Sequence, residues 1–173
     1  MATAFRRIAP WTAGITDILL TFGVFTRGLN GGFIFDDFSN LVSDPHWRLT
    51  ALTLEGLQEA IGNGFSGLAG RPLAMLSFAL DHLRAGPDPS ALKFTNIGLH
   101  ALNALLVFFL VREISRITLS AQNQNTAGST LLAAWVALAW SLHPLQTSTV
   151  LYIVQRMEIG AATGILLACL AYI

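Results

Sequence analysis

The sequence has little charge, and this scarcity limits what the chain can be. Only 12% of its 173 residues are charged, 53% are hydrophobic, and the formal net charge is zero. Soluble domains carry about 25% charged residues. A chain with half that share has too few polar side chains to cover a globule, so we expect lipid to solvate much of its surface. The lack of a basic excess argues against nucleic acid as a partner.

Cysteine is almost absent as well. The single cysteine, Cys169, lies in an apolar run near the chain end. It cannot form an intrachain disulfide, and one thiol does not indicate a metal site, so cysteine usage does not identify the compartment.

What the sequence does contain is a series of apolar segments. A helix needs about 20 residues to cross the hydrocarbon core of a bilayer. Segments of about this length predict four spans, at residues 8–26, 93–111, 127–143 and 157–173. The third and fourth are short at one end, and the fourth is cut off at the chain end. The expected fold class is therefore an all-α membrane protein of about four transmembrane helices.

The first apolar segment begins like a signal peptide, with two arginines before the apolar run. The run is too long for a signal peptide and no small-residue cleavage site closes it, so we expect a retained span. Asp17 lies inside this span, and because a carboxylate is costly in lipid we expect it to face other helices.

The distribution of arginine predicts an orientation. Arg6 and Arg7 precede the first span, and Arg112 and Arg116 follow the second. Because positive residues favour the cytoplasmic side, the N-terminus is expected inside the cell and residues 27–92 outside. The chain then divides into three parts: 1–26 with the first span, 27–92 as an outer loop, and 93–173 with three further spans.

The outer loop has helical patterns of its own. Residues 52–61 place leucine and isoleucine near helical spacing, which predicts a short interfacial helix. A second stretch begins with Pro72 and ends at Gly86, as helices that start with proline and stop at glycine do. It is too short to span a bilayer, so a surface or re-entrant helix is expected.

Asp36 and Asp37 are adjacent carboxylates between Phe35 and Phe38, where the chain leaves the first span. One interpretation is that they end the span and stay solvated. The other is that one acts as a general base, or that the pair binds a divalent cation, Mg²⁺ or Mn²⁺, with a phosphate-bearing substrate. Aromatic neighbours favour a carboxyl pKa closer to neutrality.

A polar stripe lies near the start of the second span. Asn96, His100 and Asn103 are spaced by four and then three residues, which places them on one helix face. Such a polar intramembrane face is expected to line a cavity or to contact another helix.

Three further polar residues are predicted on the outer side. Pro144 ends the third helix near His143, and Arg156 begins the fourth. Arg71 precedes the second outer helix. Arginine forks grip phosphate, so Arg71, His143 and Arg156 are candidate phosphate ligands. Alternatively, His143 caps a helix and both arginines reach toward headgroups.

Four blocks of sequence together resemble a known family. In chain order they are GFIFDDFSNLVSDP, GRPLAMLSFALD, FTNIGLHALNALLVFFLV and AWSLHPLQTSTVLYIVQRMEIGAATG. They resemble the first spans of membrane glycosyltransferases of the GT-C superfold, and within it the transmembrane-and-TPR protein O-mannosyltransferases and their bacterial relatives. The resemblance covers most of residues 20–173.

The resemblance implies a fold, a reaction and site residues. The family fold is a multi-span helical bundle with a long first outer loop, and tetratricopeptide (TPR) repeats often follow it. The implied reaction moves a sugar from a polyprenyl-phosphate donor to an acceptor hydroxyl on the non-cytoplasmic face. Asp36 or Asp37 matches the acidic residue that serves as base or metal-linked carboxylate. Arg71, His143 and Arg156 match recurring positions of the blocks.

The chain also departs from the family pattern. Relatives often carry Glu where this chain has Ser148, so any acidic role is absent there. The chain ends inside its fourth span, whereas the family bundle has more spans. The isolated chain is therefore expected to be inactive.

Two functions of different classes follow. In the first, the chain is the N-terminal membrane portion of a glycosyltransferase in the inner membrane of a bacterium. Its partners would be the bilayer, a polyprenyl-phosphate-linked sugar, and an acceptor protein or glycan whose hydroxyl a base deprotonates. In the second, it is a non-catalytic multi-span subunit that packs with other membrane subunits. A transporter fragment would show an inverted repeat, and the sequence has none.

Overall fold

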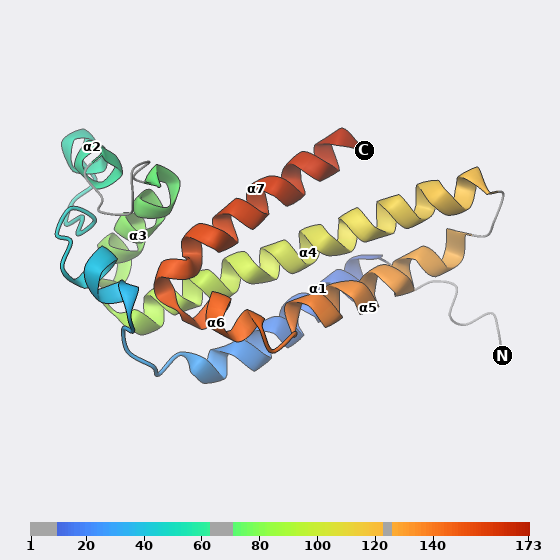
Figure 1. The fold of residues 1–173 in the computed structure, drawn as a ribbon, viewed down its shortest axis with the longest axis horizontal. Helices are drawn as coiled ribbons and strands as arrows, with labels where there is room; N and C mark the ends of the chain where they lie inside the picture. The colour runs from blue at the N-terminus through green and yellow to red at the C-terminus, as the bar shows by residue number, and fades with distance from the viewer. Residues whose placement is uncertain (1–9, 63–70, 123–125) are drawn as a thin grey trace.

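The computed structural model describes residues 10–62, 71–122 and 126–173, and these residues form helices and loops without strands. The predicted all-α class is confirmed for this part of the chain. Figure 1 shows long helices side by side and shorter ones gathered at one end. In chain order the elements are α1 (Pro10–Phe25), η2 (Thr26–Gly28), η3 (Phe38–Val42), α2 (Leu54–Gly62), α3 (Pro72–Ala85), α4 (Pro89–Ala121), η4 (Thr126–Gly128), α5 (Ser129–Ser141), α6 (Gln146–Leu151), η5 (Ile153–Gln155) and α7 (Arg156–Tyr172).

α4 is the central helix and is longer than predicted. It has 33 residues, or about 50 Å at 1.5 Å per residue. Asp88 caps its start by accepting a hydrogen bond from the Ser90 N–H at 3.0 Å. The helix continues past the predicted span because the polar residues that follow residue 111 can also form a helix. Arg116 and Glu113 support this part with an ion pair at 2.6 Å, three residues apart on the helix.

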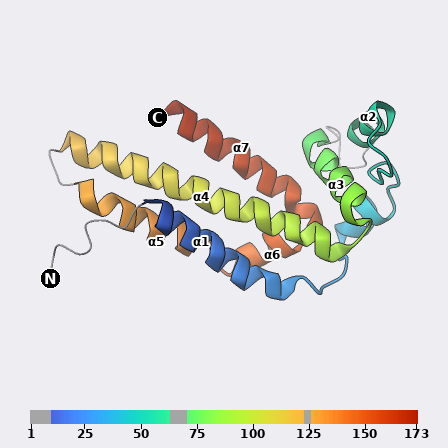
Figure 2. The ribbon, with the colours of Figure 1, turned by 180° about the vertical axis from the view of Figure 1, so that it is seen from behind.

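α1 and α5 pack along α4 and form the bundle (Figure 2). The core there consists of Phe108 of α4 against Ala133 and Ala137 of α5. α1 approaches α4 closely at Gly14, where a Cβ atom would lie 2.8 Å from the Leu105 side chain. Small residues on α1 and α5 therefore allow three helices to share one apolar core.

Two helical segments are long and apolar enough to cross a membrane, judged by length and composition. They are α4 and the 20 residues of Ile153–Tyr172, which include α7. Over the described residues α1 has 16 residues and α5 has 13. At 1.5 Å per residue both are shorter than the roughly 30 Å hydrocarbon core. The predicted count of four spans is not confirmed.

Both predicted outer-loop helices are present. α2 covers most of residues 52–61. α3 begins with Pro72 and ends at Ala85, and it is followed by Gly86, whose φ of 67° suits glycine. Trp47 is 1% exposed and contacts Phe78 of α3 edge to face. This tryptophan attaches the irregular segment between η3 and α2 to α3.

The chain breaks between α5 and α7 much as the sequence predicts. α5 ends at Ser141, two residues before His143, and α7 begins at Arg156. The short helix α6 and the turn η5 lie between them. This break leaves backbone carbonyl groups without helical partners, and side chains of α4 must satisfy them.

Candidate functional site

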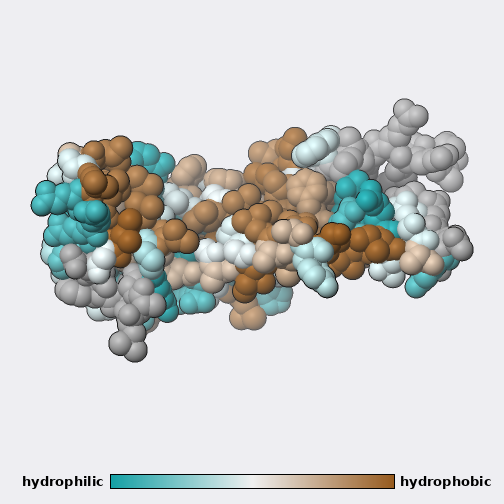
Figure 3. Space-filling view, turned by 90° about the horizontal axis from the view of Figure 1, so that it is seen from above, coloured by the Kyte–Doolittle hydropathy of each residue, from teal (hydrophilic) through white to brown (hydrophobic). Residues whose placement is uncertain are grey.

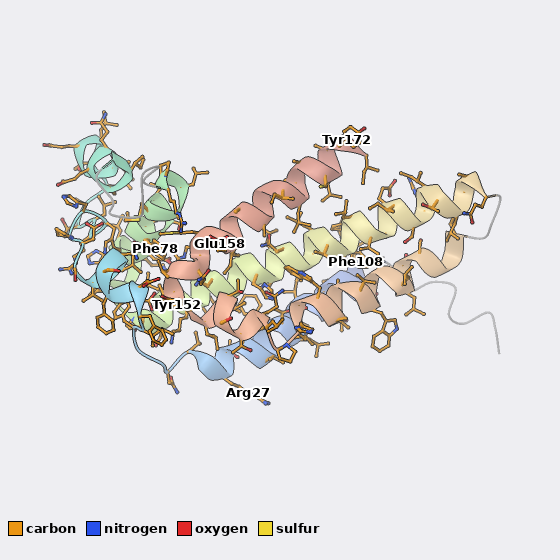
Figure 4. All side chains as sticks on the ribbon, in the orientation of Figure 1. Arg27, Phe78, Phe108, Tyr152, Glu158 and Tyr172 are labelled. Carbon is orange, nitrogen blue, oxygen red and sulfur yellow. The ribbon has the colours of Figure 1, made fainter. Side chains whose placement is uncertain are left out.

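A buried polar cluster lies where the loop after α1, α3, α4 and the α6–α7 break meet. We call this cluster the junction; it consists of Asp37, Asp81, Lys93, Asn96 and Arg156, none more than 6% exposed. Figure 4 labels two of its neighbours, Phe78 and Tyr152, near the end of the molecule where α2 and α3 lie.

Asp37 is fully buried and joins distant parts of the chain. Its two carboxylate oxygens accept hydrogen bonds from the N–H groups of Ile34, at 3.0 Å, and Val154, at 2.8 Å. Burial raises the pKa of Asp37, and these backbone bonds and the Lys93 ammonium oppose that increase. Lys93 also donates to the Gly31 carbonyl at 2.6 Å. Asp37 thus fastens the loop after α1 to the start of η5.

Asp36 has the opposite environment, although it is the next residue. Its side chain is exposed. Its backbone N–H donates to the Tyr152 hydroxyl at 2.8 Å, and its carbonyl accepts from the Asn40 side chain at 2.9 Å. The backbone is therefore held while the carboxylate faces outward, where a substrate could reach it.

Arg156 is 1% exposed, and protein groups surround its guanidinium. It forms an ion pair with Asp81 at 2.8 Å and donates to the Asn96 side chain at 2.7 Å and to the Leu92 carbonyl at 2.6 Å. The guanidinium carbon also lies 4.2 Å above the centre of the Phe78 ring. Phosphate could bind here only by displacing these partners, so the phosphate-binding role stays a prediction.

The predicted polar stripe of α4 contacts other helices. Asn96 donates to carbonyl groups of the α6–α7 break, among them Val150 and Ile153. His100 Nε2 lies 2.9 Å from the Ser141 carbonyl of α5, and Asn103 donates to the Ile159 carbonyl of α7 at 3.0 Å. The stripe thus gives these buried carbonyl groups hydrogen bonds that lipid could not supply.

Arg71 and His143 have separate partners. Arg71 is exposed at the start of α3, and its guanidinium contacts the Met157 sulfur at 2.7 Å. His143 is exposed beyond α5, and its Nδ1 accepts from the Leu145 N–H at 3.3 Å. Among the described residues no hydrogen bond joins His143 to Arg71 or Arg156, so the structure does not assemble the three into one anion site.

The two aspartates do not converge on a common point. Both oxygens of Asp37 face backbone N–H groups, whereas Asp36 is exposed. In the part of the chain that the structure describes, no cluster of three or more His, Cys, Asp or Glu side chains could hold a metal ion. A shared site for Mg²⁺ or Mn²⁺ does not fit these residues as placed, and a cation at Asp36 alone stays a prediction.

Curated proteins similar to this chain share one description. Protein O-mannosyl-transferase Tmtc1 of Drosophila melanogaster is 28% identical over 168 residues, which cover 88% of this chain and 17% of that protein. Protein O-mannosyl-transferase TMTC1 of Homo sapiens is 29% identical and covers 86% of this chain and 16% of its own length. Human TMTC2 is 34% identical over 103 residues, 60% of this chain and 11% of that protein.

The resemblance to protein O-mannosyltransferases is confirmed. The chain spans about one sixth or less of the length of these curated relatives. No family profile and no solved structure matches the chain.

Three residues of this region were not singled out by the sequence. Asp81 and Lys93 pair with groups that only the fold brings near, and Tyr152 contacts the backbone of Asp36. One signal was available for Lys93, because it stands at the edge of a long uncharged segment where an unpaired ammonium would be costly. No local pattern marks Asp81 or Tyr152.

Proposed function

We propose that this chain is part of a membrane-bound glycosyltransferase that moves a sugar from a polyprenyl-phosphate donor to an acceptor hydroxyl of a protein or glycan. The observation that carries the proposal is Asp36, an exposed carboxylate on a backbone fixed by two hydrogen bonds. The names of the relatives support the reaction class, because they describe protein O-mannosyl-transferases.

In this proposal Asp36 is the general base. Its carboxylate accepts the proton of the acceptor hydroxyl as the acceptor oxygen bonds to the anomeric carbon of the sugar. The bond from that carbon to the lipid phosphate breaks, and the phosphate leaves with the electron pair. Asp37 is less suited, because its oxygens already accept backbone hydrogen bonds.

The surroundings of Asp36 suit a lipid-linked donor. Phe35 is 81% exposed and Phe38 is 52% exposed, so apolar side chains flank the carboxylate. They offer contact to the isoprenoid chain. Of the predicted phosphate ligands, Arg71 is the arginine left exposed, and it would reach a phosphate with the least rearrangement.

The test of the base is a pair of neutral variants in the full-length protein. Asp36→Asn should lower sugar transfer by a factor of about 10²–10⁴, the usual range for a lost general base. Glu55→Gln removes another exposed outer-loop carboxylate and serves as the matched control. Near-normal turnover of Asp36→Asn would remove this residue from the mechanism.

We also propose that the chain is integral to a membrane, the inner membrane of a bacterium, with residues 27–92 outside the cytoplasm. On the face seen in Figure 3, hydrophobic and neutral residues cover the middle of the molecule and hydrophilic ones gather toward its ends. α4 begins beside α3 and runs away from it, so its C-terminal part, which contains Arg112 and Arg116, lies at the end of the molecule away from α2 and α3 (Figure 1).

Thiol labelling tests this orientation. In a Cys169→Ser background, cysteines at Thr50 and Gln122, both exposed, should react with an impermeant reagent from opposite sides of the membrane. Labelling of both from one side would contradict the proposed topology.

A second candidate is a non-catalytic membrane subunit. The observation in its favour is that Asp37, Asn96 and Arg156 contact protein groups and serve packing. In that case the purified complex would keep full activity after Asp36→Asn, whereas Arg156→Met would disrupt its assembly.

A further inference from the structure

Tyr152 lies where the α6–α7 break meets the loop of Asp36 and Asp37. Its hydroxyl accepts the hydrogen bond from the Asp36 N–H at 2.8 Å. Two residues later, the Val154 N–H donates to the Asp37 carboxylate at 2.8 Å. In the first bond the aspartate segment donates, and in the second it accepts. The bonded residues are 116 and 117 positions apart in the sequence. The two aspartates are thus attached to one short stretch of backbone.

The residue before Asp36 has an unusual conformation. Phe35 has a φ of 43°, in the left-handed region that a bulky residue rarely adopts. Burial does not explain it, because Phe35 is 81% exposed. Its ring contacts the Tyr152 ring edge to face, with centroids 6.4 Å apart. A strained conformation persists only where the surroundings fix it, and Tyr152 contacts both Phe35 and the next N–H.

The left-handed residue accompanies the different environments of the two adjacent carboxylates. The turn is closed by the Asp37 N–H donating to the Ile34 carbonyl at 2.9 Å. Within this turn Asp37 is buried and Asp36 is exposed. Loss of the Tyr152 hydroxyl would remove the one side-chain bond to the Asp36 N–H in the described structure, but would leave the bonds of Asp37 in place.

We propose that Tyr152 is a positioning residue for Asp36: its hydroxyl holds the Phe35–Asp36 peptide so that the Asp36 carboxylate is presented outward. This inference rests on the proposed function of Asp36 as the base. It assigns to Tyr152 a role separate from that of Asp37, which fastens the loop without orienting the reactive carboxylate.

The electrostatic environment of Tyr152 agrees with this placement. Burial raises the pKa of the Tyr152 hydroxyl, and the charges of Asp36 and Asp37 raise it further, while the bond from the Asp36 N–H opposes them. The hydroxyl therefore stays protonated at neutral pH. It can accept from the Asp36 backbone and still offer its own proton to the Asp36 side chain.

The kinetic test uses the full-length protein and both tyrosines of this chain. Tyr152→Phe keeps the ring and removes the hydroxyl, and it should lower kcat about tenfold per folded enzyme while the KM for the polyprenyl-phosphate donor stays within about twofold. Tyr172→Phe, at the far end of α7 (Figure 4) and 92% exposed, should leave both constants unchanged. Wild-type kcat in Tyr152→Phe would overturn the positioning role.

A spectroscopic test is independent of turnover. A fluorotyrosine placed at position 152 of the full-length protein reports its own ionisation by ¹⁹F NMR. Asp36→Asn should move its titration midpoint to lower pH, because a neighbouring negative charge is removed. Glu55→Gln should leave the midpoint unchanged. An unchanged midpoint in Asp36→Asn would show that the Tyr152 hydroxyl does not lie beside residue 36, and would overturn the inference.

The two tests separate this inference from the function it rests on. If wild-type protein transfers no sugar, the proposed function fails, whatever the titration shows. If wild type transfers sugar and Asp36→Asn does not, but Tyr152→Phe is as active as wild type, the role of Tyr152 alone is contradicted.

Discussion

The junction and the far half of α7, which follows residue 159, have opposite surroundings: one is buried and the other is exposed. At the junction, charged and amide side chains are buried and bonded across α3, α4 and α7. Beyond residue 159, α7 is mostly exposed, and a Cβ added at Gly160 or Gly164 would meet nothing within 4 Å. Yet the two regions meet in one helix, because Arg156 of the junction is the first residue of α7.

The difference shows which contacts fix the helices and which surface is left for the environment. α7 is anchored at its N-terminal end, where Arg156 and the carbonyl of Ile159 are bonded to α3 and α4. Its far half presents apolar side chains outward, as a helix facing lipid or further protein does. Stability should therefore depend strongly on the junction and weakly on the far half of α7.

The largest expected effect is loss of the buried ion pair. Arg156→Met removes the buried cation of Asp81 and leaves this carboxylate only the exposed Arg84, at 3.1 Å, so the variant should destabilise the fold by up to about 3–5 kcal/mol. Thermal unfolding in detergent, followed by circular dichroism, measures the change. The matched control is Arg116→Met, which removes an exposed pair on α4 and should cost about 0–1 kcal/mol. Adding Asp81→Leu to Arg156→Met should restore part of the loss; no recovery would mean that Arg156 stabilises by packing alone.

Substitution of two isoleucines of α7 compares the stability contributed by its packed end with that contributed by its far half. Ile159 is 2% exposed and Ile165 is 65% exposed. Ile159→Ala should cost about 2–5 kcal/mol, because it opens a cavity in the packed end. Ile165→Ala should cost less than about 1 kcal/mol on the same unfolding assay. Equal losses would contradict the distinction drawn between the two halves of α7.

Asp37→Asn has a smaller expected effect, with a characteristic pH dependence. An amide offers one acceptor oxygen to two backbone N–H groups, so the variant should lose about 1–3 kcal/mol. Asp36→Asn is the adjacent control and should stay within about 0.5 kcal/mol.

The pH dependence follows from the raised pKa of Asp37. Because its folded-state pKa lies above the ordinary value of 3.8, the folded protein binds the proton more tightly than the unfolded chain. The resulting stability is fully present below about pH 3.8 and is lost as pH rises through the raised pKa. The advantage of wild type over Asp37→Asn in unfolding experiments should therefore shrink as pH rises. An advantage that grows over this range would mean that the carboxylate is stabilised in its charged form.

The sequence predicted those features that depend on neighbouring residues. Pro72 and Gly86 set the ends of α3, and the start of α7 at Arg156 followed from the proline and polar residues before it. The polar stripe on α4 was visible because helical periodicity places residues three and four apart on one face. The family resemblance needed only the order of the four blocks.

Helix length and span number were less predictable. The apolar part of α4 ends near residue 111, but the helix continues to Ala121, because helix formation does not require apolar residues. α1 and α5 are apolar yet short, and packing against α4 gives them a core without requiring that each span a bilayer.

By itself, the sequence determined an all-helical, apolar chain with its polar groups at a few defined positions, because periodicity and helix-stop residues act locally. Only the tertiary structure decided which of two adjacent aspartates is buried, and that Arg156 pairs with Asp81 instead of facing outward. The partners come from segments far apart in the chain, and one left-handed residue, Phe35, accompanies the opposite placement of the two carboxylates. No local pattern encodes such contacts, since their free energy exists only once the helices have packed.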